Sequence, residues 1–126
     1  MRNNPGLIKT FLAGAAIGAY TLVKFGSDDK HVVEATAATD AIIGVTGQLG
    51  ASAAEEPVDV ILTGIAEVKY GGSVTRGALL TATTGGQAVA ASPGAGTNAS
   101  VIGRAMASGV SGDIGSVLLS PGQIQG

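Results

Sequence analysis

The apolar positions of this chain fall in short runs of four to seven residues, which are rich in Val, Ile, Leu and Thr and are separated by clusters of Gly, Asp, Ser and Pro. Runs of this length with β-branched side chains are typical of β-strands. The pattern predicts an all-β fold, a small barrel or sandwich, with strands at Tyr20–Phe25, His31–Thr36, Ala41–Thr46, Val58–Thr63, Ile65–Tyr70, Ala78–Thr83, Gln87–Ala91, Ser100–Ala105 and Ser116–Leu119.

Two segments also admit a helical alternative. "TAATDAII" (36–43) and "NASVIGRAMASG" (98–109) are rich in Ala, and Thr39 or Asn98 could cap a short helix. However, each segment contains a pair of β-branched residues followed directly by Gly, which favours a strand.

The two halves of the chain share an apolar pattern at an offset of 57 residues, which drifts to 59 in the middle. At 57, Ile8 falls on Ile65 and Leu22 on Leu79, and the turns "GSDDK" (26–30) and "TTGGQ" (83–87) take equivalent places. At 59, Ile43 falls on Ile102. We interpret residues 13–126 as one β domain with an internal duplication, the pseudo-repeats being about 13–66 and 70–123.

Residues 1–12, "MRNNPGLIKTFL", differ from the rest because a polar start and a Pro-Gly break precede the apolar side chains. Pro5 lacks a backbone donor and Gly6 is costly to order. The segment therefore predicts an extended N-terminal arm, free to bind a partner.

The low share of charged residues indicates that other protein chains cover part of the surface of this protein. Charged residues make up only 13% of the chain, the net charge is −2, and there are 21 Gly but only two Phe and two Tyr. A solitary soluble domain carries about twice that share of charge. The seven basic residues are scattered, which argues against nucleic-acid binding. There is no Cys and no run of 18 apolar residues, so neither a disulfide framework nor a membrane span is expected.

No catalytic pattern emerges from the candidate motifs. Gly72–Gly77 has the spacing of a phosphate loop, but Ala78 stands where such a loop needs Lys. His31 is the sole histidine, and the acidic pairs Asp28-Asp29 and Glu55-Glu56 lack the spacing of a calcium loop. We therefore expect no enzyme activity, no metal site and no cofactor.

Three stretches, "VKFGSDDKHVVEATAATDAIIGVTG" (23–47), "AEVKYGGSVTRGALLTATTGGQAVAA" (66–91) and "VIGRAMASGVSGDIGSVLLSPG" (101–122), carry a resemblance. Together they resemble the capsid decoration, or cement, proteins of tailed phages. The resemblance implies a structural virion protein on the outer capsid surface that is assembled in the host cytoplasm. It also implies two partners, the major capsid protein and the chain itself, usually as a homotrimer and in some arrangements as a dimer.

The N-terminal arm is the expected capsid contact, since it can add a strand to a partner's sheet and bury its apolar side chains. The residues assigned to this contact are Arg2, Asn3, Asn4, Pro5, Leu7, Ile8 and Phe11. Two other classes stay open. A secreted or surface β-domain would show signal cleavage near Ala15, and a small-ligand-binding β-barrel would need a lined pocket.

Overall fold

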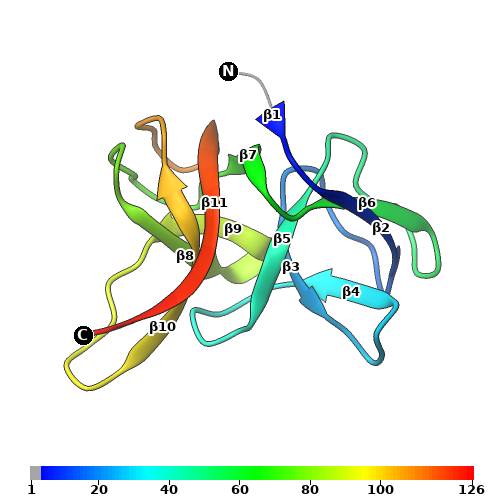
Figure 1. Ribbon diagram of the computed structural model, residues 1–126, viewed down its shortest axis with the longest axis horizontal. Coiled ribbons are helices and arrows are strands. Elements are labelled where there is room, and N and C mark those ends of the chain that lie inside the picture. Colours follow the sequence, from blue (N-terminus) through cyan, green and yellow to red (C-terminus); the bar gives the residue numbers. More distant parts are fainter. Residues whose placement is uncertain (1–3) are drawn as a thin grey trace.

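The computed structural model describes residues 4–126, which form two β-sheets and contain no α-helix (Figure 1). The first half of the chain, residues 8–63, holds β2 (Ile8–Ala13), β3 (Leu22–Phe25), β4 (His31–Glu34), β5 (Ile42–Thr46) and β6 (Pro57–Ile61). The second half, residues 64–126, holds β7 (Gly64–Lys69), β8 (Leu79–Thr83), the 3-10 turn η1 (Thr84–Gly86), β9 (Gln87–Ala90), β10 (Asn98–Ala105) and β11 (Ile114–Gln125). The all-β prediction is confirmed, and every predicted strand overlaps an observed one.

The first half forms a closed barrel in the order β2-β4-β3-β5-β6, with β6 pairing back to β2. All of its pairs are antiparallel except β2–β4. Side chains fill the interior, because alternate residues of each strand point inward. The buried residues of this cluster that lie on strands include Phe11, Val23, Val32, Val58 and Val60.

The second half forms a six-stranded sheet in the order β1-β7-β11-β10-β8-β9, where β1 is the short strand Asn4–Pro5. An isolated parallel bridge between Tyr70 and Ala88 brings the β7 and β9 segments together. This parallel contact corresponds to the β2–β4 pair of the first half, so both halves follow one pairing scheme.

The register of the strand pairs repeats as well. Phe11 pairs with Val58, and the residues 57 positions further on, Val68 and Gly115, also pair. Leu22 pairs with Val45, while Leu79 pairs with Arg104, which follows the offset of 59 on the second strand. The bridges Ile17–Ala51 and Val74–Gly109 are likewise equivalent. The two halves thus share strand order and register, although few of their residues are identical.

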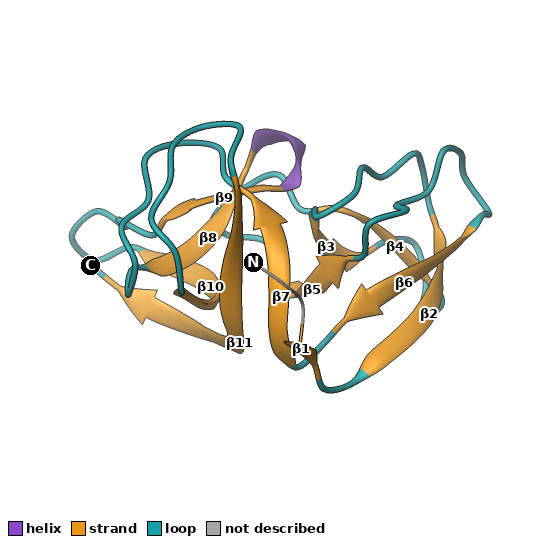
Figure 2. Cartoon of the chain, turned by 90° about the horizontal axis from the view of Figure 1, so that it is seen from above, coloured by secondary structure: helices purple, strands orange, loops and turns teal. Residues whose placement is uncertain are grey.

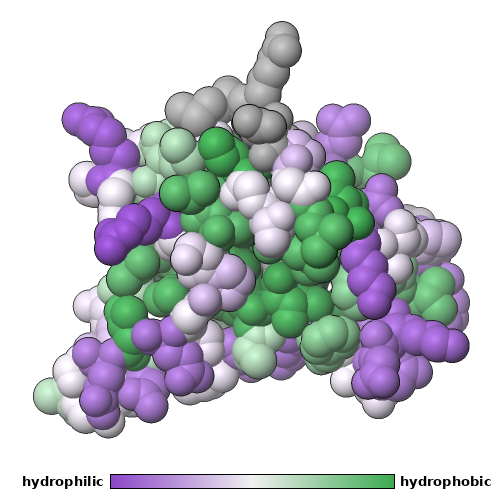
Figure 3. Space-filling model, viewed as in Figure 1, coloured by the Kyte–Doolittle hydropathy of each residue, from purple (hydrophilic) through white to green (hydrophobic). Residues whose placement is uncertain are grey.

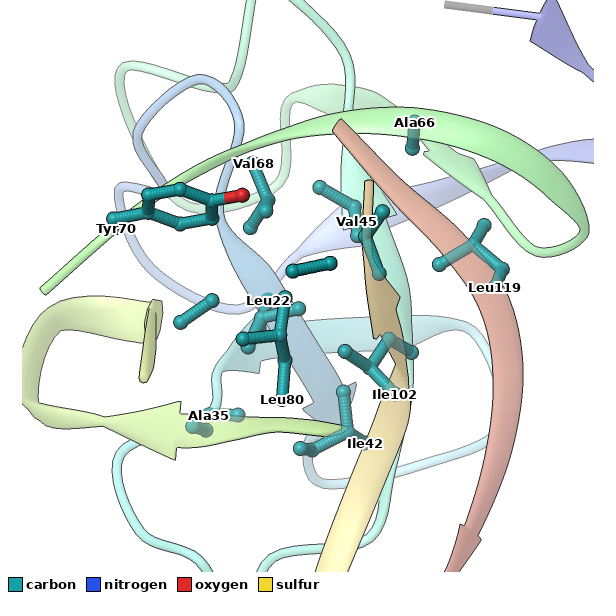
Figure 4. Packing of buried hydrophobic residues seen from close by; sticks show 14 of the residues in the cluster. Leu22, Ala35, Ile42, Val45, Ala66, Val68, Tyr70, Leu80, Ile102 and Leu119 are labelled. Carbon is teal, nitrogen blue, oxygen red and sulfur yellow. The ribbon is translucent and has the colours of Figure 1, made fainter. Parts of the chain in front are cut away.

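The halves lie side by side and share a hydrophobic core (Figure 2). Leu22, Ala35, Ile42 and Val45 point out of the first barrel and pack among second-half residues, including Val68, Tyr70, Leu80, Ile102 and Leu119 (Figure 4). The Tyr70 hydroxyl donates to the carbonyl oxygen of Ala107 at 2.6 Å, which satisfies the one polar atom of this large buried side chain.

The helical alternative is wrong at both places. Residues 36–39 form a turn in which the Asp40 carboxylate accepts a hydrogen bond from the Thr36 backbone, and residues 98–105 form β10. The β-branched residues of that segment, Val101 and Ile102, pack on opposite faces of the sheet, as strand geometry requires.

Candidate functional site

The N-terminal segment differs from the expected free arm. β2 pairs with β6 along Ile8–Leu12 and with β4 at Leu12 and Ala13, so these residues are part of the barrel. Phe11 is 5% exposed, and its ring meets that of Phe25 edge-on with the centroids 5.8 Å apart. Assigning Phe11 to a partner contact was therefore wrong, because it fills the core of this chain.

The structure places the other residues assigned to the arm differently. Arg2 and Asn3 lie outside the described residues, and of Asn4 only the backbone is described, as part of β1. Pro5, the second residue of β1, is exposed. Leu7 and Ile8, in contrast, are 58% and 46% exposed. The Leu7 backbone N–H donates to the Thr63 hydroxyl at 2.7 Å, which fixes this apolar pair at the junction of the two halves. Leu7 and Ile8 are thus the arm residues that a partner could bury.

A second exposed apolar group lies on the outer face of the second sheet. Leu118 on β11 is 46% exposed, and its strand neighbours are Ile65 on β7 and Arg104 on β10. The Arg104 guanidinium donates to the carbonyl oxygen of Gly77 at 2.8 Å. Seen as in Figure 1, apolar residues form a broad area across the middle of the molecule, and polar residues gather around its margins (Figure 3).

His31 lies between two carboxylates at the outer end of the barrel. Its Nδ1 is 2.7 Å from Asp28 and its Nε2 is 2.9 Å from Glu55, so the imidazole joins the 26–30 turn to the 47–56 loop. The hydrogen bond to Glu55, followed by that to Asp28, raises the pKa of His31. The hydrogen bond from His31 lowers the pKa of Asp28. Among residues 4–126, no group of side chains is suited to hold a metal ion. The two hydrogen bonds of His31 link the two loops.

Two surface depressions have the volume of a small-ligand site. One, of about 300 Å³, lies beside Lys9, Phe11 and Lys30, with the Lys9 ammonium 5.0 Å from the centre of the Phe11 ring. The other, of about 380 Å³, is lined mainly by small residues, among which the buried Thr81 hydroxyl has no hydrogen-bond partner. The first is lined by a single aromatic residue and the second by none, whereas small-ligand sites are lined mainly by hydrophobic and aromatic side chains. Within the described part of the chain, no helix is long and apolar enough to cross a membrane.

Comparison with known proteins finds a solved structure with a similar fold. No protein-family model and no curated protein sequence matches the chain. Among solved structures, the chain is similar to the N base of head fibre gp8.5 of bacteriophage phi29, with a TM-score of 0.70 and 19% sequence identity. The alignment covers 90% of this chain and 93% of that one, so the likeness extends over both halves.

Proposed function

We propose that this chain is a structural protein of a phage head that binds the outside of the capsid shell and stabilises it, without catalytic activity. The observation that carries the proposal is the fold shared with a phage head-fibre base over 93% of that base. The sequence resemblance to capsid decoration proteins leads to the same class independently. The low share of charged residues, 13%, suits a surface covered by neighbours.

Leu7 and Ile8 are the proposed contact with the major capsid protein. Both are exposed apolar side chains, and the hydrogen bonds of Gly6 and Leu7 to Thr63 hold the segment in place before binding. A preordered contact loses less conformational entropy on binding than a flexible arm does. A shell presents many equivalent sites, so contacts of modest affinity are enough when an oligomer engages several at once.

The test uses shells of the virus that encodes the chain, prepared without it. The wild-type chain should co-sediment with these shells to saturation. Leu7→Asp combined with Ile8→Asp should lower occupancy at least tenfold, because both substitutions place a charge in the buried contact. Val110→Asp is the matched control, since Val110 is 58% exposed, as Leu7 is, and lies outside the other loops that could contact the shell.

Two results would contradict the proposal. Failure of the wild-type chain to sediment with the shells would reject capsid binding itself. Wild-type occupancy by the folded double variant would reject the N-terminal contact, and the loops at 47–57 and 92–98 would become the candidates.

A further inference from the structure

The barrel of the first half closes over only part of β2. On one side, β6 pairs with β2 from Ile8 to Leu12, but on the other side β4 pairs with it at Leu12 and Ala13 alone. Within the part of the chain that the structure describes, the β4 side of β2 is therefore open over Ile8–Phe11. An open strand edge of this kind can pair with a strand of another chain.

Two residues direct their backbone groups out of this open edge. In an antiparallel pair the N–H and C=O groups of successive residues point alternately to the two sides of the strand. The Leu12 N–H donates to the Lys30 carbonyl oxygen at 2.8 Å on the β4 side, so the groups of Ile8 and Thr10, four and two residues earlier, point the same way. Among residues 4–126, no strand lies beside Ile8 and Thr10 on that side.

The second half shows what an edge of this kind accepts. Gly64 and Ile65 of β7 are equivalent to Leu7 and Ile8 at the offset of 57 residues. The outer edge of β7 is covered there by β1, which pairs antiparallel with both residues and lies on the side opposite to β11. The fold thus accepts a short, antiparallel, extended segment at this position, and the first half leaves the equivalent position open.

Two lysines border the open edge. The depression of about 300 Å³ is lined by Lys9 and Phe11 of β2 and by Asp29 and Lys30 of the turn before β4. The Phe11 ring holds the Lys9 ammonium 5.0 Å from its centre. Neither lysine forms an ion pair with a described residue, and Asp29 is the one acidic side chain in the described lining. The depression therefore carries a net positive charge, which an acidic side chain complements.

We propose that an extended segment of the major capsid protein adds to the open edge of β2 as an antiparallel strand and places an acidic side chain between Lys9 and Lys30. Its backbone bonds to Ile8 and Thr10, and its apolar side chains cover Leu7 and Ile8, which are exposed at the same edge. This inference rests on the proposed capsid binding and adds the chemistry of the shell segment that the chain recognises.

Proline at position 10 tests the strand pairing on shells prepared without the chain. Proline removes the N–H that points out of the edge, and its ring obstructs a strand beside it. Thr10→Val also loses the hydroxyl that donates to Asp59 at 2.6 Å, but it keeps the N–H. Thr10→Pro should therefore bind the shells about tenfold more weakly than Thr10→Val.

Ala90→Pro is the control for proline itself. Ala90 is an exposed residue of β9, the last strand of its sheet, and its N–H points away from β8 because the neighbouring Ala91 donates to Leu79. This variant should bind as the wild type does. Circular dichroism shows whether each variant is folded.

Charge reversal tests the acidic segment. Lys9→Glu and Lys30→Glu should each weaken binding about threefold, as the loss of a partly exposed ion pair does. Lys69→Glu makes the same change of charge at an exposed residue of β7 in the second half and should leave binding unchanged. Unchanged binding by both Lys9→Glu and Lys30→Glu would overturn the acidic segment.

Hydrogen exchange of the wild-type chain tests the pairing without a substitution, and it decides the matter if Thr10→Pro does not fold. The Thr10 amide should exchange more slowly on the shell than in the free chain. If the wild type sediments with shells, equal binding by Thr10→Pro and Thr10→Val, or unchanged exchange at Thr10, would overturn strand addition and leave capsid binding intact. Failure of the wild type to sediment would reject both. A mass in solution that Thr10→Pro lowers would assign the edge to a second copy and overturn the capsid segment.

Discussion

The two halves share strand order and register, but they use different residues at two positions where the backbone φ angle is positive. Tyr20 and Glu55 in the first half have φ angles of 55° and 73°, and the residues 57 positions further on, Gly77 and Gly112, have 89° and 92°. Holding a side chain in this left-handed region costs about 1–2 kcal/mol, which glycine avoids. The first half thus carries strain that the second half lacks, and at Glu55 the side chain that it retains binds His31.

The halves also differ in how their sheets are covered. Val45 is enclosed in the core that the two halves share, whereas its equivalent, Arg104, faces outward with its guanidinium on Gly77. The same position in one fold therefore tolerates a valine in one half and a charge in the other. The difference shows that cover from a neighbour, and not the strand itself, decides which side chain fits.

The largest expected effect comes from exchanging these two residues. Val45→Arg should cost at least about 4 kcal/mol, because it places an unpaired charge in the shared core. That loss is most of the stability of a small domain, so the variant should be unfolded or nearly so by circular dichroism. A Val45→Arg chain with wild-type melting temperature would show that the halves do not share a core.

The reverse substitution is the control. Arg104→Val should change the free energy of unfolding by no more than about 0.5 kcal/mol, as surface substitutions generally do. A loss similar to that of Val45→Arg would mean that Arg104 is a structural residue of the fold.

The strands were predictable because their signal is local. Val32, Val60 and Val117 each lie in a short β-branched run that ends in a turn, and all three are buried in strands. The offset of 57 residues, read from the sequence, also describes the register of the pairs, because the equivalent apolar residues are the ones that point inward.

The place of the N-terminal segment was not predictable in the same way. β2 shows no clear apolar alternation, since Lys9 and Thr10 precede Phe11, and its partner β6 lies about 49 positions further along the chain. Pairing at such a separation depends on the closed barrel, which no short window of sequence displays. The difference in burial between equivalent residues was hidden for a similar reason, because Leu22 and Leu79 are the same residue type and only their surroundings differ.

The next largest effect tests whether β2 belongs to the barrel. Phe11→Ala should reduce the free energy of unfolding by about 3–5 kcal/mol, the range for truncating a buried aromatic side chain. Its equivalent in the second half, Val68, is also fully buried, but Val68→Ala removes fewer atoms and should cost less. Urea denaturation with an unchanged m-value measures both. A free N-terminal arm would instead predict wild-type stability for Phe11→Ala.

A smaller effect is expected at two equivalent glycines. A Cβ on Gly44 would lie 2.5 Å from the carbonyl oxygen of Ile61, and a Cβ on Gly103 would overlap the carbonyl oxygen of Leu118, the residue equivalent to Ile61. Either alanine forces the neighbouring strand to shift, at a cost of about 1–3 kcal/mol. Gly47→Ala is the matched control, because nothing lies within 4 Å of its Cβ position. The melting temperature of Gly47→Ala should be higher than those of Gly44→Ala and Gly103→Ala. An unchanged melting temperature for Gly103→Ala would show that Gly44 and Gly103 are not structurally equivalent.

The smallest effect is a pH dependence confined to the first half. Asp28, His31 and Glu55 can titrate. The residues at the equivalent positions of the second half, 57 residues further on, are Gly85, Ala88 and Gly112, which cannot. Because the hydrogen bonds to Glu55 and Asp28 raise the pKa of His31 above 6.5, the folded chain holds this proton more tightly than the unfolded chain does. The resulting stabilisation is fully present below about pH 6.5 and is lost as the pH rises through the raised pKa of His31.

Asp28 acts in the opposite direction at lower pH. Its pKa is lowered from 3.8, first by the hydrogen bond from His31 and then by the backbone N–H of Lys30, so its contribution is present above pH 3.8 and is lost as the pH falls further. The melting temperature should therefore be highest between about pH 4 and pH 6.5 and decline slightly towards pH 9. In His31→Gln the decline above pH 6.5 should disappear, since the chain contains no other histidine. A wild-type melting temperature that stays constant from pH 6 to pH 9, or a decline that persists in His31→Gln, would show that the two carboxylates do not hold His31 in its charged form.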